Sequence, residues 1–464
     1  MKKILILMLI GCAFELNSMS STMNHRTVTS SPLLYKQTGY AYKEFSLEIE
    51  PYVSGMFDPT HTMGNLGIDG KSTIRLDQLG NGDINPELIL LGASNPEADY
   101  HSTVTFTPQL LLYGGLFHCY KQYEHVFFDV RTALIKCKTI VNLDELGGGN
   151  GGIPGPNGDI IYNAYDAFTQ SYWNYGKIGA SNELIGFENI QILLGASTDM
   201  PSFASNRSQS YVAGFAVIEV PTGAGTTSQW LFEPQVGTNH WAFGFGTDFM
   251  TIWDNGYSLV LGGNYRHFIA NWETRSFDLT QNGQWSRYLP LDTIAGLALS
   301  TPPGDEGPVS IIPGINLFTQ DALIQGRDQI TLYARLQKQF ESCLFEVSYN
   351  FFYTEKETIN VVDTIAQGFG LYDIFTEGGI TTAHLAQINQ NQPLQDLVPV
   401  TLVTSDLHLA SGAAGAWMSN TVAVRLQRVQ DYYTYGIGSS VDLAHSAQAL
   451  STWSVWANFE VLLS

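Results

Sequence analysis

The sequence has little charge, and little of that charge is positive. Charged residues make up 14% of its 464 residues, and 22 Lys and Arg stand against 43 Asp and Glu. The formal net charge is −21 and the pI is near 4.7. A chain this acidic repels a phosphate backbone, so nucleic acid is excluded as a main partner. Soluble domains average roughly 25% charged residues, so the composition is also unusual for a soluble enzyme.

Cysteine is scarce as well. Past the N-terminal segment the chain has Cys119, Cys137 and Cys343, which are too few for a disulfide scaffold. If residues 119–124 turn a hairpin, Cys119 and Cys137 lie about 40 Å apart at about 3.3 Å per residue, far beyond the roughly 7 Å limit for a disulfide. We interpret all three as small apolar groups, and we expect no metal site and no cofactor.

Long hydrophobic runs are absent too. No segment offers the 18 or more apolar residues that a membrane-spanning helix needs. The N-terminus instead has two lysines, a short apolar run at 4–10 and then small or polar residues, which predicts an export signal over residues 1–20. Cleavage after Ser20 at a small-x-small site and lipidation of Cys12 in a lipobox-like Leu-Ile-Gly-Cys are alternatives, as is an uncleaved helix or strand.

What the sequence does have is alternation. Past residue 40, apolar and polar residues alternate with period two in segments of about ten residues, separated by clusters of Gly, Asn, Asp and Pro. In the last segment every second residue from Trp453 to Leu463 is apolar, while Asn458 and Glu460 lie on the other face. One face suits lipid and the other suits water, which is typical of a transmembrane barrel strand or a large β-sandwich.

The connections distinguish these two folds. Long and short connections alternate, so the long ones fall on one side, as in outer-membrane barrels with short periplasmic turns and long external loops. Short connections are expected at 118–122, 254–256 and 341–342, and Asn255-Gly256 is a strong turn signal. The predicted strands cover residues 42–57, 100–117, 123–141, 184–196, 209–220, 239–253, 257–273, 328–340, 343–356, 417–429, 434–443 and 451–463.

We therefore predict an all-β fold, a closed antiparallel transmembrane β-barrel of about 12 strands with long external loops, in the lipid of the cell outer membrane. Fourteen strands are the alternative if Val400–Leu409 also spans, and a soluble β-sandwich is the rival fold. The expected organisation is a signal peptide at 1–20, an N-terminal extension at 21–41 and a single barrel domain at 42–464.

The alternation also assigns charges to the lumen. An arginine that faced lipid at mid-bilayer would cost about 2–4 kcal/mol, so charges on the polar face of a strand must point inward. One interpretation is a constriction that selects solutes, and the other is an ion-pair network that plugs and rigidifies the barrel. The inward charges are predicted to be Glu48, Asp129, Arg131, Arg266, Arg335, Glu346, Arg425 and Glu460.

Two further groups of residues fit a barrel. Tryptophans near predicted strand ends indicate an aromatic girdle at the headgroup level. The last strand resembles the C-terminal signal by which assembly machinery recognises such barrels, although the chain ends in Leu463-Ser464 and not in an aromatic residue. We therefore expect the barrel-assembly machinery as a partner. The girdle residues are Trp241, Trp253, Trp272, Trp417 and Trp453, and the assembly residues are Val455, Ala457, Phe459, Val461 and Leu463.

Motifs for catalysis are missing from the sequence. There is no Gly-x-Ser-x-Gly elbow and no His-Glu-x-x-His helix. His445-Ser446, next to Asp442, is a hydrolase-like fragment, but adjacent strand residues point to opposite faces and do not easily form a nucleophile–base pair. We do not expect an enzyme.

One stretch resembles a known family. It comprises Val220-Pro221-Thr222-Gly223, then Gly237, and then the sequence HWAFGFG at 240–246. The stretch resembles the outer-membrane proteins grouped with phenol-degradation (meta-pathway) genes, which are relatives of the long-chain fatty-acid transporter barrels. This resemblance implies passage of hydrophobic or aromatic small molecules.

The predicted function is a porin-like channel that passively passes small solutes, hydrophobic ones included. A structural or adhesin-like surface barrel without transport is the first alternative. A hydrolase embedded in a barrel is the second.

Overall fold

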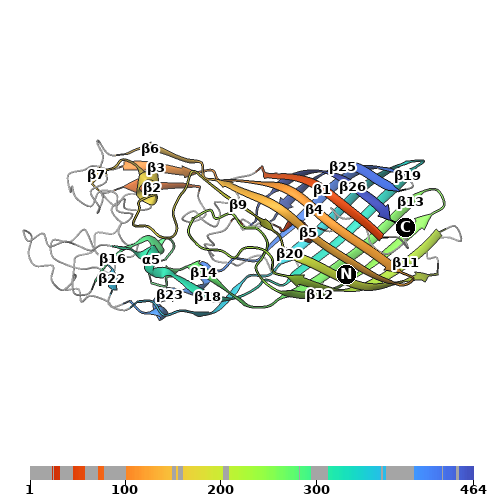
Figure 1. Ribbon diagram of the computed structural model, residues 1–464. Helices are drawn as coiled ribbons and strands as arrows, with labels where there is room; N and C mark the ends of the chain where they lie inside the picture. The colour runs from red at the N-terminus through yellow and green to blue at the C-terminus, as the bar shows by residue number, and fades with distance from the viewer. Residues whose placement is uncertain are drawn as a thin grey trace, which may run out of the picture.

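The computed structural model describes residues 23, 26–31, 45–57, 72–77, 101–148, 153–154, 160–201, 208–281, 283–293, 312–366, 369–371, 402–430, 432–445 and 449–463. The molecule is elongated, with a β-barrel at one end and small sheets that extend from the other (Figure 1). No helix within these ranges is long and apolar enough to cross a membrane.

Twelve antiparallel strands within the described ranges form the barrel, which confirms the predicted fold class and strand count. The strands follow one another around the wall in chain order, and β10 pairs with β5, so the sheet closes. They are β1 (Phe45–Met56), β4 (Gln109–Tyr123), β5 (Val126–Ile140), β10 (Ile190–Met200), β11 (Ser208–Val220), β12 (Ala242–Trp253), β13 (Tyr257–Phe268), β19 (Gln329–Phe340), β20 (Cys343–Thr354), β24 (Trp417–Val429), β25 (Tyr433–Ala444) and β26 (Thr452–Leu463).

The fourteen-strand alternative is wrong. It required the apolar segment 400–409 to span the membrane. The described part of that segment instead forms short elements, η5 (Thr404–Asp406), β23 (Leu407–His408) and the start of η6 (Leu409–Gly412).

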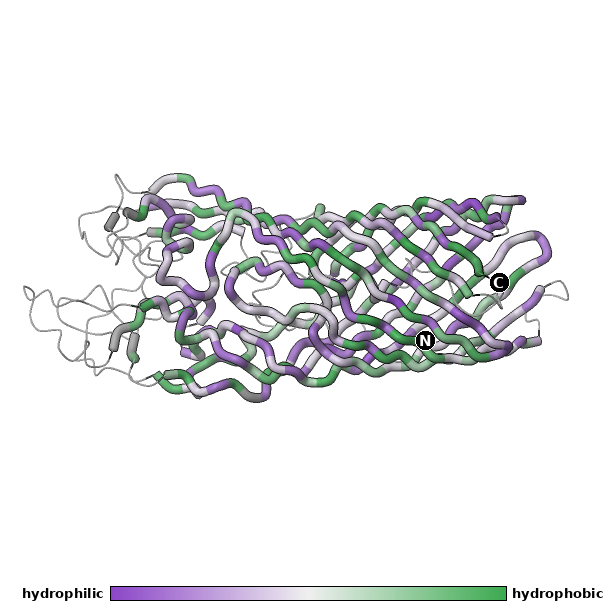
Figure 2. Tube along the Cα trace, viewed as in Figure 1, coloured by the Kyte–Doolittle hydropathy of each residue, from purple (hydrophilic) through white to green (hydrophobic). Residues whose placement is uncertain are grey.

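The outer face of the barrel is apolar. Along β26, Val455, Phe459 and Leu463 are 45–50% exposed, while Asn458 and Glu460 on the opposite face are buried. Figure 2 shows the same alternation of hydrophobic and hydrophilic residues along the other barrel strands. A closed ring leaves no strand edge unpaired, and an apolar outer face suits lipid and not water. The protein is therefore an outer-membrane β-barrel surrounded by outer-membrane lipid.

Short turns join the strands at one end of the barrel. The turn between β12 and β13 includes Gly256, whose φ of 81° is one that side chains rarely adopt. The expected turn at 118–122 is wrong, because β4 continues to Tyr123 and the chain turns at Glu124-His125. Residues 118–122 contain neither Gly nor Pro and keep the alternation of buried and more exposed side chains, so nothing ends the strand there.

The position of this turn also changes the predicted separation of two cysteines. Cys119 faces Val130 and Cys137 faces Leu112 across the β4–β5 pair, so the two thiols are about 23 Å apart along the strands at about 3.3 Å per residue. That distance is shorter than expected but still excludes a disulfide. Cys119, Cys137 and Cys343 are free thiols.

One strand of the wall is interrupted. β9 (Ser181–Phe187) pairs with residues 134–140 of β5, and β10 pairs with residues 126–131, so the two strands follow one path along β5. Glu188 and Asn189 lie between them, and both side chains are buried although they are consecutive. This is the effect of a β-bulge, in which an extra residue breaks the alternation and re-aims a side chain. The interruption thus points two polar side chains in succession toward the interior.

The long external connections fold into what we call the cap. Figure 1 shows its small sheets beyond the barrel. Its strands are β2 (Thr73–Asp77), β3 (His101–Phe106), β6 (Leu143–Gly147), β7 (Ile153–Pro154), β8 (Ile160–Ile161), β14 (Asn271–Ser276), β15 (Asp278–Leu279), β16 (Pro290–Thr293), β17 (Ile312–Pro313), β18 (Thr319–Gln325), β21 (Thr358–Val362), β22 (Phe369–Leu371) and β23. Its helices are α3 (Ala164–Phe168), η4 (Ser286–Tyr288), α5 (Gly314–Phe318), η5 and η6.

An aromatic cluster forms part of the core of the cap. The ring of Tyr288 stacks on Trp173 at 5.3 Å between centroids, and Phe168 packs edge-on to both rings at 5.4 and 5.2 Å. Trp285 and Phe106 extend the cluster, with their rings 6.3 Å apart. These residues come from three different connections of the barrel. Burial of their rings therefore ties those connections into one folded unit.

A buried ion pair also stabilises the cap. Arg287 donates from its backbone N–H and its Nε to Asp278 Oδ1, at 3.1 and 2.9 Å, and from Nη2 to Oδ2 at 2.9 Å. Both residues are 2% exposed. Burial acts to lower the pKa of Arg287, but the neighbouring Asp278 carboxylate raises it, and the result lies above the ordinary value for arginine. The guanidinium is therefore charged at any physiological pH.

Arg287→Met should loosen the cap and leave the barrel folded. The substitution leaves the Asp278 carboxylate buried without its cation, and breaking a buried pair in this way costs about 3–5 kcal/mol. We expect faster proteinase K cleavage between β13 and β19, while the folded barrel keeps its heat-modifiable migration in SDS gels. Arg428→Met, which replaces an exposed arginine on β24, is the control. Equal cleavage rates for the two variants would contradict the prediction.

Candidate functional site

A segment that precedes the first strand lies inside the barrel. We call residues 26–31, which include η1 (Val28–Ser30), the plug. Arg26 lies over the ring of Phe352, with Cζ 4.5 Å from the centroid, and its Nη1 donates to Asn350 Oδ1 on β20. Val28, Thr29 and Ser30 are at most 7% exposed. The plug therefore fills part of the lumen and is buried by the surrounding wall.

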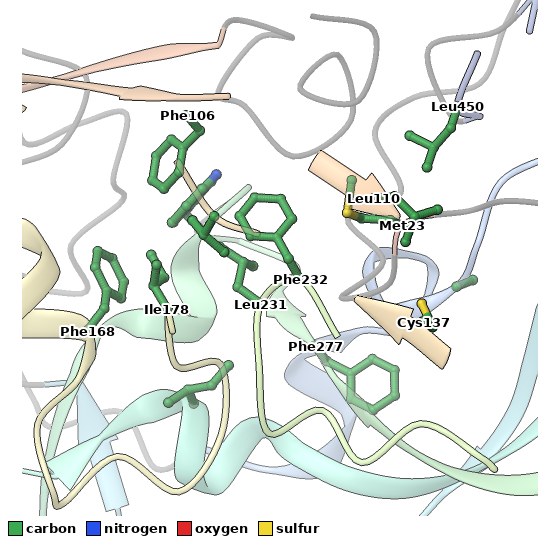
Figure 3. Close-up of a cluster of buried hydrophobic side chains, with 14 of the residues drawn as sticks. Met23, Phe106, Leu110, Cys137, Phe168, Ile178, Leu231, Phe232, Phe277 and Leu450 are labelled. Atoms are coloured by element: carbon green, nitrogen blue, oxygen red, sulfur yellow. The ribbon is translucent and has the colours of Figure 1, made fainter. Parts of the chain in front are cut away.

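Hydrophobic packing holds the chain at Met23, shortly before the plug. Met23 is 2% exposed and belongs to the same buried cluster as Leu110 and Leu450, near which Figure 3 shows it. The same cluster continues through Phe232 to Phe106 in the cap (Figure 3). The N-terminal part of the chain is thus held by apolar packing at Met23 and by polar contacts in the plug.

Glu188 makes the most directed contact with the plug. The backbone N–H of Val28 donates to Oε1 at 3.0 Å and that of Thr29 donates to Oε2 at 2.8 Å. Glu188 is 1% exposed. Hydrogen bonds to a carboxylate are stronger than bonds between neutral groups, so one side chain holds two consecutive backbone groups of the plug. The bulge between β9 and β10 makes this possible, because it directs Glu188 inward.

The bulge is itself held by neighbouring residues. Thr222 donates from Oγ1 to the carbonyl of Glu188 at 2.6 Å, and the backbone N–H of Thr238 donates to Asn189 Oδ1 at 3.2 Å. The Asn189 amide in turn donates to Glu219 Oε1 at 2.6 Å. The sequence stretch that carries the family resemblance, 220–223 with 237–246, therefore contacts the bulge through Thr222 and Thr238. Its residues position Glu188 for the plug.

Two glycines of this stretch lie too close together for side chains. A Cβ on Gly223 would lie 2.7 Å from the Cα of Gly237, and a Cβ on Gly237 would lie 2.7 Å from Asn189 Oδ1. Gly237 also has a φ of 74°, which favours glycine. The glycine spacing is therefore explained by close packing of one loop against the bulge.

Charged groups deeper in the lumen form ion pairs with one another. His118 lies between two carboxylates, with Nε2 2.9 Å from Asp129 Oδ1 and Nδ1 3.2 Å from Glu48 Oε2. Arg131 Nη2 lies 2.6 Å from the other oxygen of Asp129. Glu460 faces Glu48 across the β1–β26 pair. Four of the eight charges predicted for the lumen thus come together on adjacent strands.

The remaining predicted arginines each lie near a carboxylate. Nitrogen–oxygen distances are 3.4 Å for Arg425 with Glu50, 3.9 Å for Arg335 with Glu346 and 2.8 Å for Arg266 with Glu219. These six residues are at most 3% exposed. The structure therefore places all eight predicted charges on the inner face of the barrel.

Three members of this network, Glu50, His118 and Glu219, were not among the charges predicted from the sequence. Glu50 has the same strand parity as Glu48, so the alternation alone could have identified it. His118 was assigned to a turn that lies elsewhere. Glu219 lies at the end of β11, beside the stretch that was interpreted through its resemblance to a family.

The predicted tryptophans do not share one location. Trp241, Trp272 and Trp453 are 37–49% exposed, but Trp272 lies on β14 of the cap. Trp253 is the half-buried last residue of β12. Trp417 is 4% exposed and packs on Phe352, with ring centroids 4.8 Å apart. Its inclusion in the girdle is wrong, because it shares strand parity with the inward residues of β24.

The hydrolase-like fragment lies at the end of β25, with Asp442 on the strand and His445 just after it. Asp442 accepts from Thr421 Oγ1 at 3.0 Å and lines a cavity beside the plug. His445 is exposed and contacts the Asn420 amide. Ser446 lies outside the described residues. The hydrogen bonds described for Asp442 and His445 thus go to different residues, Thr421 and Asn420.

Cavities surround the plug within the described part of the lumen. One is lined by Arg26 and Thr27 together with residues of the cap and of β20. A second adjoins Thr29 and Ser30, and a third adjoins Arg26, Val28 and Ser31. The plug therefore forms part of the wall of each of these spaces.

Several solved structures are similar to this chain. An outer membrane channel from Pseudomonas putida F1 is 5% identical, with a TM-score of 0.41 over 92% of this chain and 97% of that one. A TodX mutant, described as a monoaromatic hydrocarbon channel, is 9% identical, with a TM-score of 0.31 over 91% and 90% of the two chains. The outer membrane protein OprD from Pseudomonas aeruginosa is 9% identical, with a TM-score of 0.24 over 95% and 97%. No protein-family model and no curated protein matches the sequence.

Glu188→Ala should loosen the plug. The substitution removes the acceptor of two backbone N–H groups, and each hydrogen bond to a charged group contributes about 1.5–3 kcal/mol. We expect a cysteine placed at Thr27 to react with a membrane-impermeant maleimide about tenfold faster or more, measured on cells that carry a protein with its native cysteines replaced by alanine.

Glu183→Ala is the matched control for this experiment. Glu183 lies on β9, five residues before Glu188, but its carboxylate pairs with Lys136 and Lys138 and is 41% exposed. This variant should label at the parental rate. Unchanged labelling in the Glu188 variant would show that the Glu188 carboxylate does not hold the plug.

Proposed function

We propose that the protein is an outer-membrane channel for small solutes and that the plug closes its lumen in this conformation. The proposal depends mainly on one observation, that a segment outside the barrel strands occupies the lumen and adjoins cavities on several sides. If the plug moves, those cavities merge into a wider passage. A barrel that served only as a rigid scaffold would not need a separable segment in its interior.

The way in which the plug is held supports its movement. A wall strand such as β12 is paired along its length with a neighbour on each side. The described polar contacts of the plug with the wall involve Glu188 and Asn350. These few bonds can exchange for water without opening the β-sheet. The wall thus remains closed toward lipid when the plug is displaced.

We propose that the lumen charges chiefly stiffen the passage. Ion pairs engage Glu48, Asp129, Arg131, Arg266, Arg335, Glu346 and Arg425, and Glu460 lies opposite Glu48. This arrangement favours the rigidifying interpretation over an open ring of free charges. A second effect is selection by size and charge once the plug has moved. The family resemblance extends the proposed solutes to small hydrophobic molecules.

Processing and assembly complete the proposal. We propose that residues 1–20 are removed on export, so that Met23 becomes the third residue of the mature chain. Lipidation at Cys12 is the alternative, and both positions lie outside the described residues. The lipid-facing residues of β26 from Val455 to Leu463 are proposed to be recognised by the barrel-assembly machinery, and Trp241, Trp253 and Trp453 to lie at the membrane interfaces.

A structural or adhesin-like barrel is the second candidate function. The observation in its favour is the cap, whose external connections form a folded unit with a buried aromatic core. A folded cap presents a defined surface outside the cell. In that case the lumen would stay closed in every state of the protein.

Deletion of residues 21–31 separates the two functions. We expect proteoliposomes with the deletion variant to swell about tenfold faster in arabinose than those with the full mature chain. A plug favoured by about 1.4 kcal/mol leaves about one channel in ten open, whereas the deletion leaves none plugged. Heat-modifiable migration in SDS gels verifies that the barrel has folded. A folded deletion variant that stays impermeable would favour the structural function, and ester hydrolysis that His445→Ala abolishes would favour an enzyme.

A further inference from the structure

Several hydrogen-bond donors that line the cavity between the plug and the cap lack partners among the described residues. Its lining includes Arg26 from the plug, Arg275 from β14, Arg327 before β19, and Thr354 and Trp417 from the barrel wall. Arg275 Nε and Nη1, Thr354 Oγ1 and Trp417 Nε1 have no hydrogen-bond partner among the described residues. Each of these three side chains is at least nine-tenths buried. Buried polar groups in folded proteins nearly always have partners, so this surplus points to a ligand.

The two carboxylates that line the same cavity already have partners within the protein. Glu273 accepts from Arg275 Nη2 at 2.6 Å and lies 3.3 Å from His240 Nε2. Glu357 accepts from the backbone N–H of Ala414 at 2.8 Å and lies 3.7 Å from Arg327 Nε. Three arginines stand against these two glutamates in the lining, which gives a net charge of +1 without His240. The charge and the spare donors therefore favour an anionic group.

The rest of the lining is aromatic. Phe268, Phe352 and Trp417 contribute rings, and the Phe352 and Trp417 rings contact each other at 4.8 Å between centroids. These rings give an apolar surface beside the donors. A small molecule that combines a carboxylate with a flat apolar body matches both parts of the lining.

We propose that this cavity binds small organic carboxylates, with the carboxylate at Arg275, Thr354 and Trp417 and the apolar body against the aromatic rings. The proposal names a class of solute for the channel and in that respect rests on the proposed function. Binding itself requires no permeation. It can be measured on the closed barrel in detergent, so the two proposals can fail separately.

Sodium benzoate is the probe, and isothermal titration calorimetry on the purified mature protein in detergent is the measurement. Benzamide has nearly the same shape without the charge, and inorganic phosphate has charge without the ring. We expect benzoate to bind about tenfold more tightly or better than either, because hydrogen bonds to a charged acceptor exceed those to a neutral one. Equal binding of benzamide would overturn the anion site, and equal binding of phosphate would overturn the role of the rings.

Thr354→Val and Trp417→Phe test the location without breaking an ion pair. Each removes one unpartnered donor and leaves an apolar side chain in its place, and each should weaken benzoate binding about tenfold. Arg275→Gln is less suitable alone, because it leaves Glu273 and Glu357 without their shared cation and can prevent folding. Heat-modifiable migration in SDS gels confirms the fold of each variant.

Matched controls replace the same residue types elsewhere. Trp241→Phe changes a tryptophan that is 46% exposed on the outside, and Thr198→Val changes an exposed threonine of β10. Both should bind benzoate like the parent. Absence of benzoate binding by the folded parent, or unchanged binding in both cavity variants, would overturn the proposal. If the parent binds benzoate but the deletion variant stays impermeable, the binding site is supported and only the proposed channel function is contradicted.

Discussion

Backbone N–H and C=O groups in hydrocarbon have no water to bind, so each must find a partner within the protein. The barrel meets this requirement through the pairing of β5 with β10, which joins the two ends of the sheet. Once the ring is closed, every strand has one face toward lipid and one toward the lumen. Charged residues at the depth of the hydrocarbon can then lie only inside, where they must be compensated by one another. The pairing of Asp129 with Arg131 and of Glu219 with Arg266 follows from this constraint.

The same constraint decides how a non-strand segment can occupy the lumen. The plug cannot join the ladder of the closed sheet, so its backbone groups need side-chain partners. A regular strand directs only every second residue inward. The bulge at Glu188 and Asn189 directs two consecutive polar residues inward, one toward the plug and the other toward the loop that holds the bulge. The interruption in the wall is therefore explained by the need to anchor this segment.

The sequence was sufficient for the features that alternation controls. Strand number, lipid-facing and lumen-facing residues, and all eight inward charges follow from period-two patterning. Features that depend on contacts between distant segments could not be predicted in this way. The plug contacts Glu188, which is about 160 residues away, and the cap joins Trp173 with Tyr288. Trp417 shows an intermediate case, since its position at a strand end suggested the girdle while its parity with Ser419 and Thr421 indicated the lumen.

Charged pairs line the lumen near the turns, whereas aromatic rings pack in the cap, and residues of both kinds occur where the two parts meet. Toward the turns, carboxylates and arginines pair at 2.6–3.9 Å. In the cap, buried rings of residues such as Phe168 and Tyr288 pack against each other. At the junction, β14 brings Arg275 from the cap to the aromatic pair of Phe352 and Trp417 in the wall. Glu273 and Glu357 compensate the arginine charge there but engage only one of its nitrogens, Nη2. Two further nitrogens of Arg275, together with Thr354 Oγ1 and Trp417 Nε1, therefore stay without acceptors among the described residues at the place where the cap meets the lumen.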